Sequence, residues 1–428
     1  MLTRLDLRGF TGALADVLPR PAPDQGEALG AVRSIIADVR ARGDEALYEL
    51  TERYDGVVLE SLSVDPAEFS DALERTDPTL REALTASAEA IRDHHTGRRP
   101  VEHRTGNDGV VVRSSSRPVE RAGCYVPGGR AAYPSTLLMT AIPARVAGVD
   151  RVVVCVPPGA DGRVSQVTLA AAAVAGVDVV HPVGGAQAVA ALAYGTQTIP
   201  AVDVIAGPGN VYVALAKREV AGVVGVPAGF TGPSEVVVVA DSTVDPDFAA
   251  IDIVVQAEHG PDGLAWLVTW DEAVADAVVA AVDRLTAAAP RRDEIESTLL
   301  VAGHCVLVDG PDQALAVSDA IAPEHLQLMV EGAGSMAARV RNAGAVFCGQ
   351  WSPASLGDYM AGPSHVLPTA GTARFAGALS VADFTRDVHV ITADRGALEL
   401  VGPHIVALAE AEGLDSHAES IRLRLRHG

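Results

Sequence analysis

Short runs of β-branched and other apolar residues recur along this chain, and alanine-rich amphipathic stretches separate them. Val152–Val156 and Val236–Ala240 are two such runs. Strands that are buried on both faces have this continuous apolar character, and parallel strands need crossover helices between them. The alternation therefore predicts an α/β fold in which helices cover parallel sheets. Because 428 residues exceed one ordinary domain, we expect at least two such units.

Helical and strand-like segments follow one another in two series. Before them, residues 1–25 form a short extension that ends in a proline-containing loop, and helices are expected over 27–58 and, in at least two pieces, over 65–97. The first βα series runs from Cys124 to Ala228, with strands expected at 152–156, 177–183 and 202–206. The second series starts at Glu235, and its expected helices are 245–259, 271–288 and 311–321, with strands at 264–269, 305–308 and 326–330. Two helices are expected in the tail, near 395–412 and 416–426.

The composition excludes several classes of protein. A formal net charge of −22 opposes binding to nucleic acid, which requires a basic surface. No apolar stretch reaches the ~18 residues of a membrane span, and the N-terminus MLTRLDLRGF lacks the apolar centre of a signal peptide. The four cysteines show no CxxC spacing, which is typical of reduced structural thiols. We therefore expect a soluble, cytoplasmic protein that binds neither nucleic acid nor membrane.

Three glycine-rich turns, Tyr125–Gly129, Val183–Gln187 and Gly207–Asn210, each lie between a strand-like run and a helix. The free N–H groups at such a helix start favour an anion, and nucleotides bind at the carboxyl ends of parallel strands. Each turn alone also fits an ordinary βα connection. Gly332–Ala337 is a weaker match to a dinucleotide fingerprint, since no acidic residue follows at the required place. Lys217, the only lysine, is expected at the surface or facing a phosphate.

Gln256 and His259 stand three residues apart near the expected end of a helix. That spacing puts both side chains on one face, about 5–6 Å apart at Cβ, where an amide oxygen and an imidazole nitrogen can share a metal ion. Glutamine is an unusual zinc ligand, so a solvated or capping pair is the alternative interpretation. His94 and His95 stand among charged residues and are expected on an exposed face.

Glu324 and His325 place the two side chains most used in proton transfer next to each other. We expect Pro323 to begin a helix after an extended Ala322. The first turn of that helix would carry both side chains, and its dipole would keep His325 unprotonated and ready to act as a base.

Nine phrases together resemble the histidinol dehydrogenase family, and they follow one another in order along nearly the whole chain. They are RAGCYVPGGRAAYPST (121–136), VGGAQAVAALAYGT (183–196), GPGNVYVALAKREV (207–220), GPSEVVVVAD (232–241), QAEHGPDG (256–263), PEHLQL (323–328), WSPASLGDY (351–359), HVLPT (365–369) and AEGLDSH (411–417).

This resemblance implies a four-electron oxidation of L-histidinol to L-histidine through the aldehyde, with two NAD⁺ reduced in turn. It implies that zinc is held by Gln256, His259, Asp358 and His417. The substrate contacts that it implies are Ser234, His365 and Glu412, together with His325 and the four zinc ligands. The implied cofactor contacts are Tyr125, Gln187 and Asn210, and the implied acid–base pair is Glu324 and His325.

The family is homodimeric, and the resemblance implies that residues near Glu412 and His417 enter the partner's site. It also implies two Rossmann-like domains, one of them discontinuous, with small N- and C-terminal extensions. We assign the metal and acid–base residues to a domain of 26–119 and 231–379, and NAD binding to 120–230. The extensions are then 1–25 and 380–428.

Three other functions fit parts of the pattern. A relative that oxidises another polar alcohol, such as a sulfonated diol, would keep the fold and change the substrate. A silent NAD-binding protein would lack Glu324, His325 or a ligand, and a structural-zinc protein would avoid Gln and Asp ligands.

The residues before His365 read Ala-Gly-Pro-Ser where some family members carry Gly-Thr-Asn, which affects loop detail. Since no cysteine stands beside the acid–base pair, Glu324 is expected to activate water, and Cys124 and Cys155 to be dispensable.

Overall fold

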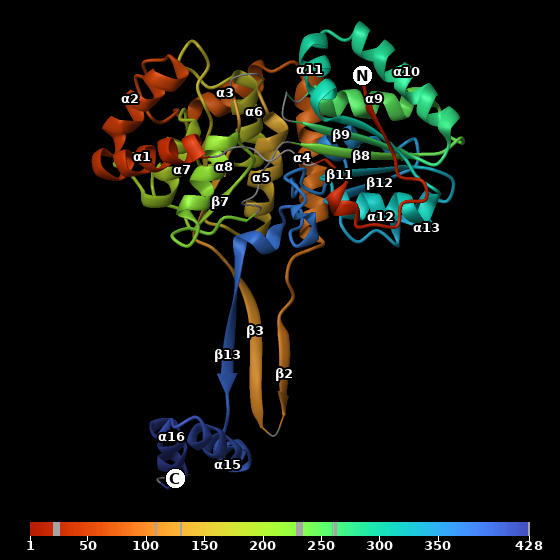
Figure 1. The fold of residues 1–428 in the computed structure, drawn as a ribbon. Coiled ribbons are helices and arrows are strands. Elements are labelled where there is room, and N and C mark those ends of the chain that lie inside the picture. The colour runs from red at the N-terminus through yellow and green to blue at the C-terminus, as the bar shows by residue number, and fades with distance from the viewer. Residues whose placement is uncertain are drawn as a thin grey trace.

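The structure is a computed structural model that describes residues 1–19, 26–107, 109–128, 131–227, 234–258, 260 and 263–426. Two α/β lobes lie side by side, and a long stalk of strands descends from them to a pair of helices (Figure 1). One lobe contains a six-stranded sheet and the other a four-stranded sheet. The predicted α/β class with two parallel, Rossmann-like sheets is confirmed. No helix within these ranges is long and apolar enough to cross a membrane.

The larger sheet has the strand order β1-β10-β9-β8-β11-β12, and its neighbouring strands run parallel. Its strands are β1 (Thr3–Asp6), β8 (Glu235–Ala240), β9 (Leu264–Thr269), β10 (Gly303–Leu307), β11 (His325–Met329) and β12 (Ala345–Cys348). Successive residues of a strand point to opposite faces, so Val236 and Val237 of β8 belong to different apolar cores. One face is covered by α9 (Pro246–Ala257), α10 (Glu272–Ala288) and α11 (Arg292–Ala302). The other face is covered by α12 (Pro311–Ile321) and α13 (Ala333–Ala337).

The smaller sheet has the strand order β6-β5-β4-β7, also parallel. Its strands are β4 (Arg121–Tyr125), β5 (Arg151–Cys155), β6 (Val179–His181) and β7 (Val204–Ala206). One face packs against α3 (Ala67–Arg75), α4 (Pro78–Thr96), α5 (Pro134–Ala147) and α6 (Gln166–Ala175). The other packs against α1 (Gly26–Arg42), α2 (Asp44–Asp55), α7 (Gly185–Tyr194) and α8 (Val211–Val220).

The domain boundaries given by the sequence stay a prediction, but the packing bears on two of them. Strand β1, in the expected N-terminal extension, pairs with β10 and so completes the larger sheet. Helices α1 to α4 share apolar cores with the smaller sheet, although 26–119 was assigned with the larger one. The contacts therefore favour a division in which the segment before the stalk belongs to the lobe of the smaller sheet.

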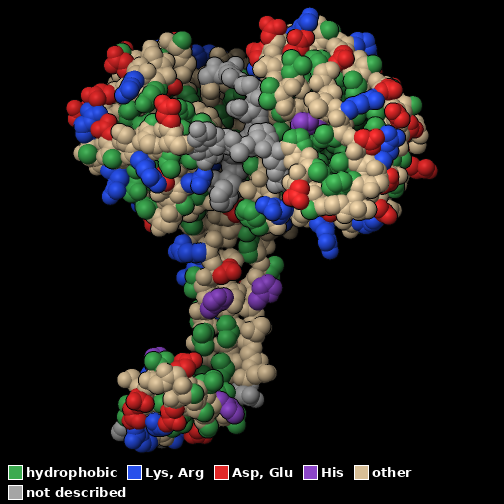
Figure 2. Space-filling model, in the orientation of Figure 1, with side chains coloured by type: hydrophobic (Ala, Val, Ile, Leu, Met, Phe, Trp, Pro, Cys, Tyr) green, Lys and Arg blue, Asp and Glu red, His purple; other side chains and the backbone are tan. Residues whose placement is uncertain are grey.

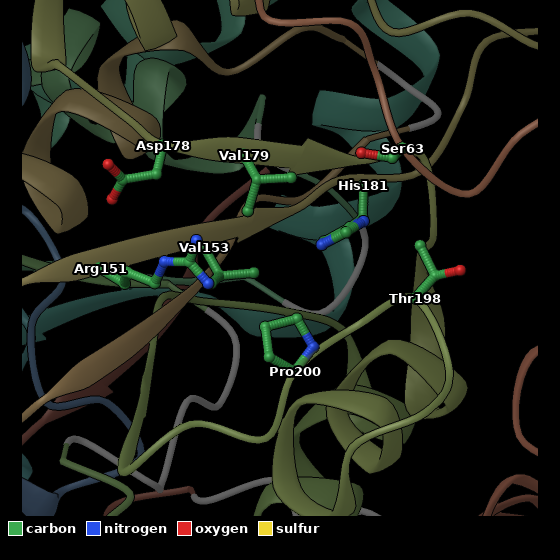
Figure 3. A pocket seen from close by; sticks show the side chains of 8 residues that line it. All are labelled: Ser63, Arg151, Val153, Asp178, Val179, His181, Thr198 and Pro200. Atoms are coloured by element: carbon green, nitrogen blue, oxygen red, sulfur yellow. The ribbon is translucent and has the colours of Figure 1, made fainter.

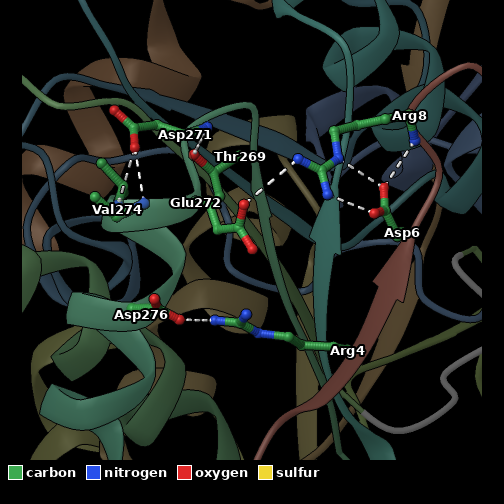
Figure 4. A network of polar contacts seen from close by, with 9 residues as sticks. Arg4, Asp6, Arg8, Thr269, Asp271, Glu272, Val274 and Asp276 are labelled. Carbon is green, nitrogen blue, oxygen red and sulfur yellow. Dashed lines mark hydrogen bonds and ion pairs between the residues drawn. The ribbon is translucent and has the colours of Figure 1, made fainter.

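A network of polar contacts fixes the N-terminal strand to helix α10 (Figure 4). Arg4 forms an ion pair with Asp276, and the Arg8 guanidinium lies 2.6 Å from Asp6 and 3.6 Å from Glu272. Because these side chains are exposed, each pair contributes little free energy, about 0–1 kcal/mol. The parallel pairing with β10 is the stronger restraint.

The stalk is an antiparallel sheet of order β13-β3-β2 that the sequence analysis did not predict. Its strands are β2 (His103–Asn107), β3 (Val110–Pro118) and β13 (Thr385–Thr392). They are largely solvent-exposed, so they lack the apolar runs by which the buried strands are recognised. At its end α15 (Arg395–Ala411) and α16 (Asp415–Arg426) pack on each other, away from both lobes (Figure 1).

Acidic and basic side chains are interspersed over the visible face of both lobes, with no continuous basic area there (Figure 2). This distribution agrees with the formal net charge of −22. The short elements not yet named are η1 (Leu14–Asp16), α14 (Ala354–Tyr359), η2 (Thr372–Arg374) and η3 (Val381–Phe384).

Candidate active site

Glu324 and His325 lie at the amino end of a strand, and the predicted helix start at Pro323 is wrong. Helix α12 ends at Ile321, and Ala322 caps it in the left-handed conformation, with φ 52° and its N–H bonded to Ser318 O at 2.8 Å. Strand β11 then begins at His325. The proline disfavours the right-handed helical conformation for the residue before it, and Ala322 adopts a left-handed rather than the expected extended backbone. No helix begins at Pro323, so the expected dipole of a helix N-terminus does not act on His325.

The backbone of Glu235 in β8 holds both members of the expected acid–base pair, Glu324 and His325. Glu235 N donates to Glu324 Oε2 at 3.0 Å, and His325 Nδ1 lies 3.3 Å from Glu235 O. A carbonyl oxygen only accepts hydrogen bonds, so Nδ1 carries the proton and Nε2 is the nitrogen able to take one up. Both side chains are almost buried, at 8% exposure, and His325 Nδ1 lies 3.7 Å from Glu324 Oε2.

Asp358 of α14 stands between two imidazoles. Its Oδ1 is 3.9 Å from His325 Nε2 and 4.0 Å from His365 Nδ1. His365 Nε2 in turn lies 3.2 Å from the hydroxyl of Thr136, which belongs to α5 of the other lobe. These residues therefore join at the boundary between the lobes.

A cavity of about 760 Å³ opens beside this group and is lined by His325, Asp358 and His365. Its wall also includes His95, which is only 1% exposed, so the prediction of an exposed face is wrong for this residue. Neither ring nitrogen of His95 has a hydrogen-bond partner among the described residues, and burial lowers its pKa to about 4. The volume is within the range of small-molecule sites.

Gln256 lies in the last turn of α9, where the sequence placed it, and is 4% exposed. Its Nε2 has no hydrogen-bond partner within the described parts of the chain. A buried amide group without a partner is costly unless a ligand satisfies it. His259 falls outside the described residues, so the predicted one-face pairing with Gln256 stays a prediction.

A buried hydrogen bond that the sequence analysis missed joins α9 to β11. Gln327 Nε2 donates to Asp252 Oδ2 at 2.6 Å, and both residues are at most 5% exposed. Asp252 precedes Gln256 by one helical turn, and Gln327 lies on the same side of β11 as His325. The bond thus holds the segments that carry Gln256 and His325 together. An aspartate amid the apolar residues of α9 was the signal that could have revealed it.

The described residues of the three glycine turns lie at the carboxyl ends of β4, β6 and β7, as predicted for parallel strands, and Gly129 of the first turn falls outside the described residues. The Tyr125 hydroxyl accepts a hydrogen bond from Gly185 N at 3.1 Å and so ties the first turn to the second. Burial raises the pKa of Tyr125 to about 12, so the phenol stays neutral. Gln187 is 2% exposed in α7, whereas Asn210 is exposed at the start of α8.

Asn210 caps α8 with its own side chain. Its Oδ1 accepts from Tyr212 N and Val213 N, each at 3.1 Å. These two amides were expected to be free for an anion, and they are already bonded. The amide Nδ2 of Asn210 is left as the donor at this exposed position.

Lys217 is fully buried, so its predicted surface position is wrong. Its ammonium group donates to the carbonyl oxygen of Gly207, the first residue of the third turn. Burial lowers its pKa to about 8.

Three comparisons with known proteins, by family model, by sequence and by structure, all match histidinol dehydrogenases. The family model described as histidinol dehydrogenase matches residues 18–425. A histidinol dehydrogenase of Parasynechococcus marenigrum is 46% identical over 94% of this chain and 92% of its own length, and one of Gluconobacter oxydans is 44% identical over 99% of both. The chain belongs to the histidinol dehydrogenase family. The crystal structure of histidinol dehydrogenase from Elizabethkingia anophelis is 31% identical, has a TM-score of 0.94, and matches over 99% of this chain and 98% of that one.

The family resemblance also named Glu412 and His417, which one chain by itself does not bring to the lobes. Glu412 caps the end of α15 and His417 lies in the first turn of α16, at the far end of the stalk (Figure 1). Ser234 immediately precedes β8, and its carbonyl accepts from Leu264 N at 3.0 Å. No group of three His, Cys, Asp or Glu side chains able to hold a metal occurs among the residues described.

A second, smaller cavity of about 180 Å³ lies along β5 and β6 of the smaller sheet (Figure 3). His181 points into it, and its Nδ1 lies 2.6 Å from Leu62 O. The volume falls below that of typical ligand pockets, and a dinucleotide does not fit. This cavity therefore does not compete with the larger one as the candidate active site.

Proposed function

We propose that this chain oxidises L-histidinol to L-histidine through the aldehyde and transfers one hydride in each step to NAD⁺. The observation that carries the proposal is a cavity at the lobe boundary that His325, Asp358 and His365 line, with Glu324 next to His325, in a chain of the histidinol dehydrogenase family. An imidazole held by a backbone carbonyl beside carboxylates suits repeated proton removal from an alcohol and a hydrate.

His325 is the proposed base of both oxidations. Its Nδ1–H faces Glu235 O at 3.3 Å, which leaves Nε2 to take the proton from the alcohol oxygen. Glu324 is the proposed activator of the water that adds to the aldehyde, and the bond from Glu235 N to its Oε2 keeps that carboxylate oriented. Neither step is proposed to use the thiols of Cys124 and Cys155, because both are fully buried inside the other lobe.

Zinc is the proposed metal, held by Gln256, His259 and Asp358 and by His417 of the partner subunit. The buried amide nitrogen of Gln256, which has no hydrogen-bond partner among the described residues, fits such a role, because rotation of the amide presents its oxygen in place of its nitrogen. Oxygen and nitrogen ligands suit a divalent ion without thiolates. When bound, the ion would act as a Lewis acid that anchors and orients the substrate.

NAD⁺ is proposed to bind over the three turns of the smaller sheet, with contacts from Tyr125, Gln187 and Asn210. A Cβ on Gly207 would collide with the carbonyl oxygen of Tyr125, so this turn passes directly over the end of β4. The arrangement follows the general rule that nucleotides bind beyond the carboxyl ends of parallel strands.

A homodimer is proposed because Glu412 and His417 need a second subunit to reach a site. The stalk and its helices expose large apolar side chains, with Ile391 68%, Leu400 62% and Leu408 67% exposed. Figure 2 shows hydrophobic side chains along the stalk and on the helical pair. Surfaces of this kind mark protein interfaces. The cytoplasmic location stays a prediction from the sequence.

The reaction is tested by counting NADH formed per L-histidinol consumed, with and without a chelator. Two NADH per substrate, lost on chelation and restored by zinc, support the proposal. One NADH per substrate, or a faster rate on a sulfonated diol than on L-histidinol, contradicts it.

His325→Asn should abolish NADH formation while NAD⁺ still binds.

Shared sites are tested by mixing subunits that carry His325→Asn with subunits that carry His417→Ala. Each parent dimer has no intact site, whereas a mixed dimer has one. Random mixing should therefore restore about a quarter of the wild-type activity. A mixture that stays inactive, although mass spectrometry shows mixed dimers, contradicts the sharing of sites.

A further inference from the structure

Lys217 stands out because the fold buries it completely. It is the chain's only lysine, among 33 basic residues of which all the others are arginine. It lies in α8 between the buried residues Leu215, Ala216 and Val220, in the apolar core shared with α1 and α7. The hydrogen bond to Gly207 O is the one polar contact that the described residues give it.

Such a position is unfavourable for stability. Within the part of the chain that the structure describes, no acidic side chain contributes to the pKa of Lys217, and burial lowers this pKa to about 8. Moving a cation out of water without a countercharge costs free energy, and an apolar side chain of similar size would pack there more stably. Stability therefore does not explain why a lysine occupies this position, and we look for the reason in function.

The acceptor of this bond begins the Gly207–Asn210 turn. Gly207 has φ +109°, and the turn crosses so close to Tyr125 that a Cβ at residue 207 would strike its carbonyl oxygen. Asn210 fixes the other end of the turn by capping α8. Lys217 reaches back from two turns further along α8, so the turn is held at both ends by side chains of its own helix.

We propose that Lys217 is a positioning residue for the dinucleotide, because its ammonium group holds Gly207 and thereby presents Asn210 to the cofactor. This inference rests on the proposed NAD⁺ site. Lys217 lies beneath the turn and touches no reacting atom, so its loss should weaken cofactor binding and leave the chemical steps intact. No part of the acid–base pair contacts it.

The test compares Lys217→Met with Arg218→Met, which removes the same charge from the exposed neighbouring position. NAD⁺ dissociation constants are measured by calorimetry, and the mobility of 204–213 by amide hydrogen exchange without cofactor. Lys217→Met should weaken NAD⁺ binding about tenfold, as expected for one charge-assisted hydrogen bond, and should speed exchange in 204–213. Arg218→Met should bind NAD⁺ within about twofold of wild type. The kcat at saturating NAD⁺ and the KM for L-histidinol should stay unchanged in both.

Lys217→Arg keeps a charged donor and should recover most of the affinity. The inference is overturned if Lys217→Met binds NAD⁺ as tightly as wild type, if Arg218→Met weakens binding equally, or if Lys217→Arg is no better than Lys217→Met. Should Lys217→Met not fold, Lys217→Gln, which is too short to reach Gly207 O, takes its place. A wild-type protein that binds no NAD⁺ would instead refute the proposed function, and the role of Lys217 with it.

Discussion

Asp252 offers a quantitative test of the polar contact that joins α9 to β11. The residue is 5% exposed, and burial raises the pKa of its carboxyl group from 3.8 to about 6, although the bond from Gln327 acts in the opposite direction. Asp252→Asn keeps the shape and an oxygen acceptor for Gln327, and it removes the charge. We therefore expect the variant to be the more stable protein at neutral and alkaline pH.

The sign follows from proton binding. Between pH 4 and pH 6 the folded protein keeps the Asp252 proton while the unfolded chain releases it, so wild-type stability falls as the pH rises through this window. A shift of about two pKa units corresponds to about 3 kcal/mol once both states are ionised. About half of this loss is complete at pH 5, so the stability difference between variant and wild type should grow by roughly 1.5 kcal/mol from pH 5 to pH 8.

Urea denaturation of both proteins at pH 5, 6.5 and 8 measures this difference, with a chelator present so that a bound metal does not contribute. Asp93→Asn, at an exposed position of α4, serves as the control for the removal of one carboxylate, and the difference for Asp252→Asn is compared with it at each pH. A difference for Asp252→Asn that stays constant or shrinks between pH 5 and pH 8 would show that the carboxylate is not disfavoured by burial, and the reasoning would be refuted.

Three further predictions concern single contacts. Cys124→Ser and Cys155→Ser should each retain both oxidations, because these thiols are fully buried and burial raises their pKa; selective loss of the second oxidation would point to a thiol intermediate. Arg4→Ala should lower the free energy of unfolding by less than about 1 kcal/mol, and a larger drop in the urea midpoint would contradict a weak exposed ion pair. Thr136→Val removes the hydroxyl near His365 Nε2, so the KM for L-histidinol should rise about three- to tenfold while the NAD⁺ dissociation constant stays unchanged. A variant with a changed NAD⁺ dissociation constant and an unchanged KM would contradict this prediction.

The buried strands and helices were predictable because their patterns are local. The expected strand at 264–269 is β9, and the expected helices at 271–288 and 311–321 correspond to α10 and α12. The long helical segment at 27–58 proved to be two helices that meet at Gly43, which has φ +61°. The exposed strand β13 was missed, because neither of its faces is buried and no apolar run marks it.

The candidate site was predictable in its residue types but only partly in its geometry. The acid–base role of Glu324 and His325 stays a prediction from adjacent residues in the sequence. The helix expected to carry them is a strand, because pairing of His325 with Val236 in the sheet outweighs the preference of proline for a helix start. Burial in the tertiary structure is the only feature that marks three further residues, Asp252, His95 and Lys217, as noteworthy. Burial depends on residues far away in the sequence, and no local spacing reports it.

The sequence by itself determined the class of fold, the family and the chemical types available for catalysis, because strand and helix patterns and motif phrases are properties of neighbouring residues. Only the tertiary structure decided that Glu235 orients Glu324 and His325, that Thr136 reaches His365 across the lobes, and that Lys217 lies beneath a glycine turn. These contacts join residues up to 229 positions apart, and their existence depends on how two sheets and their helices pack, which no short stretch of sequence specifies.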